Sequence, residues 1–172
     1  MSRIDFVTGA PLKYAHLVDR LSTVPDRTRQ AVGRAGSGDL RREPAGGGWS
    51  AQRVLAHMAV YAHHNGVFIH RMVTMYDQNR TPFDEDAIVE HEGFLRMDPA
   101  NLVRYIDDEV SKTVDFLAET PDAAWGRRGM VNGASRSVRQ QVQRHIDHFE
   151  EHIDQVAELL GTHEQVEAAP AG

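Results

Sequence analysis

The last long segment of the chain constrains its fold most, because its apolar residues recur at helical spacing over roughly six turns. Ser137 and Gln140 have the spacing of a capping box, which marks a helix N-terminus, and Gly161 is a natural helix stop. Between these signals the apolar residues follow one another at steps of three or four: Val142, Ile146, Phe149, Ile153, Val156 and Leu160. The sequence therefore predicts an amphipathic helix from Val138 to about Leu160.

The same pattern predicts two more long helices. Ser50 is a good N-cap for a helix that runs to about Tyr76, and Asp98 caps a third helix that runs to about Ala118. Weaker helical patterns cover residues 12–21 and 25–34, and a short helical turn could start at Pro121 before a loop over residues 129–134. We find no segment of strict apolar alternation, so we expect an all-α fold, a four-helix bundle.

The length of 172 residues suits a single domain, which we expect to span residues 1–162. Residues 163–172 end in Ala-Ala-Pro-Ala-Gly and have little to bury, so we expect a disordered tail. The glycine-rich residues 36–48 end the first helical region. Residues 77–97 form a long connection, and such connections often act as a lid or a binding loop when they lack secondary structure of their own.

Composition narrows the chemistry that the chain can perform. It contains no cysteine, which excludes disulfides, thiolate ligands and a cysteine nucleophile, and leaves histidine and carboxylate as metal ligands. The net charge of -6 argues against a nucleic-acid partner, although a local basic patch remains open around Arg127, Arg128, Arg136 and Arg139. The N-terminus has no apolar signal core, and no stretch approaches 18 apolar residues, so we expect a cytoplasmic protein without a membrane partner.

Histidines at helical spacing indicate a candidate metal site. His148 and His152 are four residues apart, so both imidazoles can face one ion, and His57 on the inward stripe of the second long helix could supply a third. Three histidines leave a coordination position for water or substrate, as catalytic sites do. His64 lies two turns, roughly 10 Å, from His57 and is assigned to the pocket wall or the core, and His145 is placed outside the ligand set.

The alternative is that these are boundary histidines on an amphipathic helix, partly solvated or hydrogen-bonded, which is the commoner meaning of an isolated His-x-x-x-His. A Ser-His-Asp nucleophile is disfavoured, because the chain has no Gly-x-Ser-x-Gly elbow and a helical bundle is a poor host for one.

Several stretches in order resemble the DinB-like/YfiT-like superfamily. Gly48-Trp49-Ser50 followed by Val54-Leu55-Ala56-His57-Met58 is similar to its tryptophan, helix cap and first ligand. The run from His148 to Val156 is similar to its terminal ligand pair with a following glutamine, and residues 82–86 are similar to its segment between the second and third helices. Ile153 and Asp154 depart from the family, since many members have arginine and glycine there.

The resemblance implies an up-down-down-up bundle, commonly a homodimer, in which three histidines hold a divalent ion such as nickel or zinc. Members with better understood activities use low-molecular-weight thiols, as thiol S-transferases and a mycothiol-dependent isomerase do, and others are described as hydrolases. The absence of cysteine fits a thiol borrowed from a small molecule, and it fits equally a reaction without a thiol.

Our hypothesis is a metal-dependent transferase or hydrolase that acts on a small molecule, with His57, His148 and His152 as metal ligands. Tyr61, His64, Arg80 and the loop of residues 82–86 are the expected substrate contacts. The alternatives are a non-catalytic module that binds a metal or a ligand, for example in a stress response, and a structural partner that has lost its metal.

Overall fold

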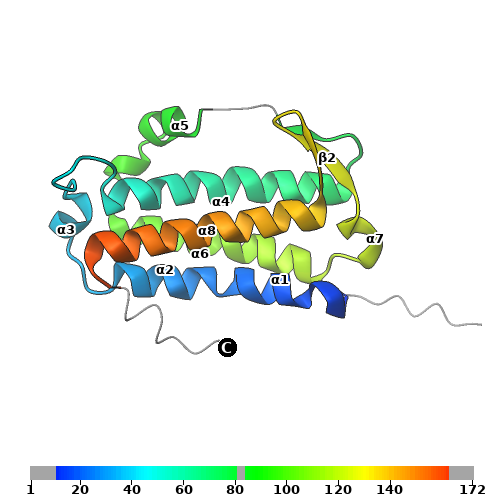
Figure 1. The fold of residues 1–172 in the computed structure, drawn as a ribbon, viewed down its shortest axis with the longest axis horizontal. Coiled ribbons are helices and arrows are strands. Elements are labelled where there is room, and N and C mark those ends of the chain that lie inside the picture. The colour runs from blue at the N-terminus through cyan, green and yellow to red at the C-terminus, as the bar shows by residue number, and fades with distance from the viewer. Residues whose placement is uncertain (1–10, 81–83, 163–172) are drawn as a thin grey trace, which may run out of the picture.

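The computed structural model describes residues 11–80 and 84–162, and long helices dominate this part of the chain. They run side by side along the longest axis (Figure 1): α1 (Leu12–Ser22) continued by α2 (Val24–Val32), then α4 (Ala51–Thr74), α6 (Pro99–Ala118) and α8 (Val138–Leu160). α4 and α6 point one way, while α1, α2 and α8 point the other, which is the up-down-down-up arrangement. The predicted four-helix bundle is confirmed.

The helix ends follow the local signals in the sequence. The Ser50 hydroxyl accepts a hydrogen bond from the backbone N–H of Arg53 at 3.3 Å, and an Asp98 carboxylate oxygen accepts one from the N–H of Ala100 at 2.9 Å. At the start of α8, Ser137 and Gln140 form a capping box, in which each side chain accepts from the other residue's N–H. Each of these caps lies where the sequence predicts it.

The segments between the long helices are more structured than the sequence indicated. The glycine-rich stretch contains α3 (Ser37–Arg41), and the connection over residues 77–97 contains β1 (Asn79–Arg80), α5 (Glu85–His91) and a 3-10 turn (Phe94–Arg96). The short helical turn predicted after Pro121 is α7 (Asp122–Trp125). Residues 82 and 83 of the expected binding loop and the tail 163–172 lie outside the described residues.

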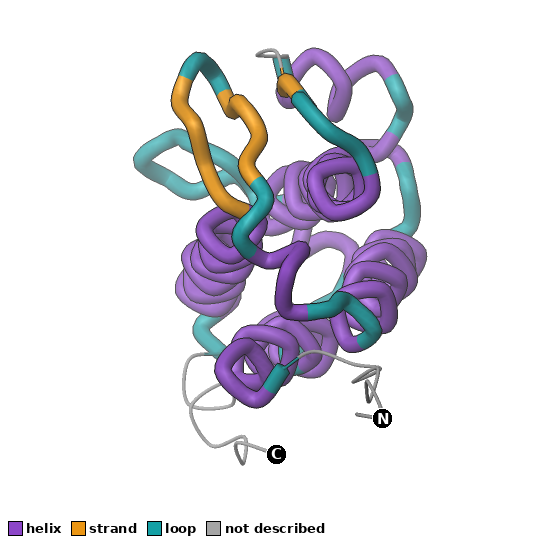
Figure 2. The backbone as a smooth tube through the Cα atoms, turned by 90° about the vertical axis from the view of Figure 1, so that its right-hand side faces the viewer, coloured by secondary structure: helices purple, strands orange, loops and turns teal. Residues whose placement is uncertain are grey.

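The expectation of a loop over residues 129–134 is wrong, because this stretch forms β-structure. β2 (Arg128–Val131) and β3 (Ala134–Ser137) form an antiparallel hairpin where we expected a loop, and β1 pairs in parallel with β2. Figure 2 shows these strands gathered on one side of the helices. The strands are two to four residues long, which is too short for alternation to show, and β1 pairs with residues about fifty positions away.

The core lies where α4 packs against α6 and α8. Its fully buried side chains include Leu55, Met58 and Ile69 of α4, Leu102 and Ile106 of α6, and Val142, Ile146 and Phe149 of α8. α4 and α6 approach closely at Gly66, where an added Cβ would lie 2.6 Å from the hydroxyl oxygen of Thr113. Glycine therefore sets the separation of these two parallel helices.

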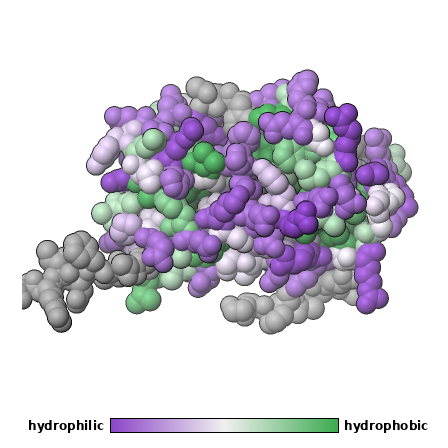
Figure 3. Space-filling model, turned by 180° about the vertical axis from the view of Figure 1, so that it is seen from behind, coloured by the Kyte–Doolittle hydropathy of each residue, from purple (hydrophilic) through white to green (hydrophobic). Residues whose placement is uncertain are grey.

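The face of the molecule opposite to that of Figure 1 is largely polar (Figure 3). On the face seen in Figure 3, hydrophilic side chains predominate and hydrophobic ones form smaller areas between them. None of the helices described by the structure combines the length and the apolar character needed to cross a membrane.

Candidate metal centre

Two helices bring the three predicted histidines together. α4 carries His57 on its buried face, and α8 carries His148 and His152 one turn apart, because side chains four residues apart lie above one another on a helix. One ring nitrogen from each histidine lies within 4.8 Å of the others. It is the one group of three or more metal-ligating side chains that the described residues form at this spacing.

The distances suit a shared ion. Nε2 of His57 lies 3.1 Å from Nε2 of His148. Two nitrogens bound to one tetrahedral ion at about 2.0–2.1 Å lie roughly 3.4 Å apart, so these rings are close to the separation that a common ligand sphere requires. The ring of His152 lies 4.8 Å from that of His57 and 4.5 Å from that of His148, centre to centre.

Burial keeps the imidazoles of His57 and His148 neutral, which is the form that binds a metal. Desolvation, reinforced by the neighbouring His152, lowers the pKa of His57 to about 4. Desolvation and the charges of the surrounding histidines and Arg144 lower the pKa of His148 to about 2. Both rings therefore present lone pairs at neutral pH, and the donor set fits nickel or zinc.

A hydrogen bond orients the third ring. Nδ1 of His152 lies 2.9 Å from the side-chain oxygen of Gln155. Because an amide oxygen only accepts, Nδ1 holds the proton and Nε2 keeps its lone pair for a ligand. The ring centre of the Trp49 indole lies 5.2 Å from that of His57 and 6.5 Å from that of His152, so this residue covers the histidines.

Two of the expected substrate contacts lie beside the histidines. The ring of Tyr61 stacks on His148 with centres 3.7 Å apart, and burial raises the pKa of its hydroxyl to about 12, so it remains a proton donor. Arg80 extends from β1 and donates hydrogen bonds to Asn65 at 3.0 Å and to Glu85 at 3.3 Å. His64 packs against the ring of His63 and lies outside the group of three.

Glu85 at the start of α5 links the binding loop to the histidines. One carboxylate oxygen accepts from Arg80, and the other lies 3.5 Å from Nε2 of His57. Burial raises the pKa of Glu85, and the Arg80 guanidinium opposes that effect. The sequence placed Glu85 in the loop of expected contacts without distinguishing it from Asp84 or Asp86.

A buried polar network behind the histidines is not predicted by the sequence pattern. The Asn65 oxygen accepts from Arg80 and, at 2.7 Å, from Gln141, while its nitrogen lies 2.8 Å from Nδ1 of His145. Asn65 and His145 are fully buried, and desolvation lowers the pKa of His145 to about 3. The available signal was the helical line from His57 through Tyr61 to Asn65, each four residues apart.

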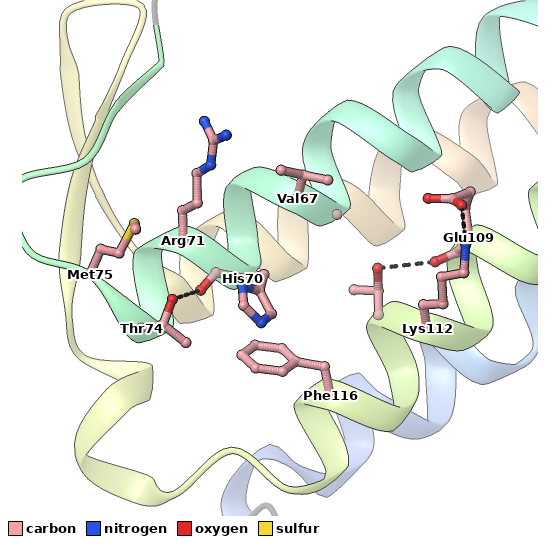
Figure 4. A pocket seen from close by; sticks show the side chains of 10 residues that line it. Val67, His70, Arg71, Thr74, Met75, Glu109, Lys112 and Phe116 are labelled. Atoms are coloured by element: carbon pink, nitrogen blue, oxygen red, sulfur yellow. Dashed lines mark hydrogen bonds and ion pairs between the residues drawn. The ribbon is translucent and has the colours of Figure 1, made fainter.

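A separate cavity of about 340 Å³ lies between α4 and α6. Figure 4 shows the ring of His70 packed against that of Phe116 in its wall, with ring centres 4.3 Å apart, and Val67 and Thr74 on the α4 side. None of the three clustered histidines lines this cavity, so it is distinct from the candidate metal centre.

A four-helix bundle with three converging histidines defines a class of helical proteins able to hold a divalent ion between two of their helices. A model of the DinB superfamily matches residues 20–156, and the chain belongs to this superfamily.

Among solved structures, the chain is similar to YfiT from Bacillus subtilis, described as a probable metal-dependent hydrolase with an unusual four-helix bundle topology. The TM-score is 0.79 at 19% sequence identity, over 92% of this chain and 90% of the other. At this identity the likeness concerns the fold. No curated protein matches the chain.

Proposed function

We propose that the chain is a metal-dependent enzyme acting on a small molecule, with His57, His148 and His152 as the ligands. The observation that carries this proposal is the convergence of three ring nitrogens within 4.8 Å, two of them on rings that burial keeps neutral. Three protein ligands leave a coordination position for a reactant. A divalent ion held there would lower the pKa of a bound water or thiol and so supply a nucleophile.

The surrounding side chains have separate tasks in this proposal. Gln155 holds the proton of His152 on Nδ1, and Trp49 excludes water from one side of the rings. The Tyr61 hydroxyl, which stays protonated, donates to a substrate oxygen, and the Glu85 carboxylate oxygen that faces His57 accepts a proton from the nucleophile. Arg80 positions Glu85 and contacts substrate together with Tyr61 and His64.

The reaction is a transfer to a low-molecular-weight thiol or a hydrolysis. Because the chain has no cysteine, any thiol comes from a second small molecule. The enzyme acts as a homodimer in the cytoplasm, without nucleic acid or membrane partners. The metal-dependent chemistry is supported by membership of the superfamily and by the donor set.

Calorimetry with Zn²⁺ and Ni²⁺ tests the site. We expect about one ion per chain for the wild type and no saturable binding for the His57→Ala, His148→Ala, His152→Ala triple variant. A matched control changes three other histidines to alanine: His16, His70 and His91. Circular dichroism establishes that each variant is folded, and equal binding by the two triple variants contradicts the proposal.

Turnover assays then separate the chemistries. Glutathione, mycothiol and bacillithiol are each offered with electrophiles, and ester hydrolysis is run in parallel on the metal-loaded protein. Metal-dependent thiol consumption indicates the transferase, and thiol-independent hydrolysis indicates the hydrolase.

A non-catalytic metal-binding module is the second candidate. It is favoured by the position of the 340 Å³ cavity between α4 and α6, away from the three histidines. One ion bound per chain with no turnover in either screen supports this module over the enzyme.

A further inference from the structure

A cleft of about 430 Å³ lies between the β3 strand and the first turns of α8. Its lining includes three arginines, Arg136, Arg139 and Arg144, and one carboxylate, that of Asp147. Such a concentration of positive charge is unexpected on a chain whose net charge is -6.

The three guanidinium groups are unpaired within the part of the chain that the structure describes, because they form neither ion pairs nor hydrogen bonds there. Asp147 is engaged elsewhere: Gln143 donates to it at 2.7 Å, and Arg20 of α1 lies 3.5 Å away. Arg128, in contrast, is bound to Ser135 at 2.8 Å and serves the hairpin. Arg128 of the basic patch that the sequence indicated is therefore occupied within the hairpin, whereas the arginines that line the cleft remain able to bind an anion.

The N-terminus of α8 does not itself favour a positively charged side chain. The first turn of α8 contains no acidic residue and does contain Arg139, although the positive end of a helix dipole favours acidic side chains. The backbone N–H groups are already served by the capping box of Ser137 and Gln140. Arg139 therefore lies where the helix dipole disfavours a positive charge, and an anion bound in the cleft would offset this unfavourable interaction.

The cleft adjoins the candidate metal centre. Arg144, His148 and His152 follow one another at four-residue steps, so they form one line along α8, and Arg144 is about 6 Å from His148 along the axis. Arg144 contributes to lowering the pKa of His148, after desolvation and the neighbouring histidines, and both Arg136 and Arg144 act on the Tyr61 hydroxyl. Arg144 at the edge of the cleft therefore lies one helical turn from the nearest of the three histidines.

We infer that this cleft binds a small molecule that carries at least two negative charges on carboxylate or phosphate oxygens, held by Arg136, Arg139 and Arg144. Guanidinium groups bind both kinds of oxyanion through paired N–H donors, so the shared chemistry is an oxyanion with negative charges a few ångströms apart. That this molecule is the substrate or co-substrate rests on the proposed function; that the cleft binds it does not.

Binding of succinate and of inorganic phosphate tests the inference and separates the two sources of charge. Calorimetry is performed on the full chain, metal-free and metal-loaded, at constant ionic strength. We expect saturable binding of at least one of the two dianions in both states. Arginine Nε–H resonances in NMR spectra should shift at the cleft residues upon titration.

The deciding comparison uses two double variants that remove the same charge. Arg139→Gln with Arg144→Gln should weaken dianion binding at least tenfold, because two charge-assisted contacts are lost. Arg42→Gln with Arg104→Gln removes two exposed arginines elsewhere and should change binding less than twofold. Thermal unfolding establishes that each variant is folded.

Three results would overturn the inference: no dianion binding by the wild type, equal weakening in the two double variants, or tighter binding of a single-stranded RNA oligonucleotide to the same arginines. The metal experiment is independent of these outcomes. If the protein binds a dianion but no metal, the inference about the cleft holds and the proposed function is wrong. If it binds a metal but no dianion, the proposed function holds and the inference about the cleft is wrong.

Discussion

Replacing Asn65 by leucine tests the buried network behind the histidines. Leucine has the same number of side-chain heavy atoms as asparagine and branches at the same carbon, so the change removes hydrogen bonds without leaving an empty space. The Asn65 side chain is completely buried and contacts Arg80, Gln141 and His145 through three hydrogen bonds. All three partners therefore lose a contact at once.

The expected cost follows from what each partner retains. Gln141 and His145 are almost fully buried and lose their hydrogen bonds with Asn65, whereas Arg80 keeps its bond to Glu85. A buried polar group left without a partner costs about 1–3 kcal/mol, so two such groups cost about 2–6 kcal/mol. We expect the free energy of unfolding to fall by about 3 kcal/mol and the melting temperature by about 6–12 °C.

Urea unfolding followed by circular dichroism measures this change. The midpoint should fall and the dependence on urea concentration should stay the same, since the folded state keeps its compactness. Asn101→Leu is the matched control, because Asn101 is exposed and accepts a hydrogen bond only from Arg104 among the interactions described. A loss below about 1 kcal/mol for Asn65→Leu, or equal losses for the two variants, would refute the reasoning.

Three further predictions concern protonation, packing and ligand orientation. The pKa of His145 is depressed in the fold, so the unfolded chain binds more protons than the folded chain below pH 6.5. The free energy of unfolding therefore falls as the pH drops from 6.5 toward 3. His145→Gln should reduce this dependence by about 1.4 kcal/mol per pH unit, measured by urea unfolding of the metal-free protein. Gly66→Ala should lower the free energy of unfolding by about 1–2 kcal/mol, because the new Cβ meets Thr113, and adding Thr113→Ala should recover most of the loss. If the effects of the two substitutions simply add, the contact does not limit stability. Gln155→Leu should weaken zinc binding about 10- to 100-fold in calorimetry, and unchanged affinity would show that His152 needs no such orientation.

Local signals made the bundle predictable. The caps at Ser50, Asp98 and Ser137 act within one turn of the chain, and the apolar stripes that follow them define which faces are buried. The convergence of His57 with the pair on α8 followed from the same periodicity, because all three lie on inward faces of helices that must pack together.

Long-range pairing was not predictable in the same way. β1 forms a strand only because β2 lies beside it, and nothing within Asn79 and Arg80 indicates that partner. The Asn65 network likewise joins α4, α8 and β1 through polar side chains, which carry no periodic signal. The contact between Glu85 and His57 depends on where the connection of residues 77–97 crosses α4, so only the three-dimensional structure reveals it.

The position of Trp49 gives the protein an internal optical reporter. The chain has two tryptophans, and Trp125 lies in α7 at the far end of the bundle from the start of α4, stacked on Tyr14 (Figure 1). A paramagnetic ion among the histidines would quench the emission of Trp49 and leave that of Trp125 as an internal reference. Occupancy of the centre can therefore be followed by fluorescence in the unlabelled protein, before any substrate is known.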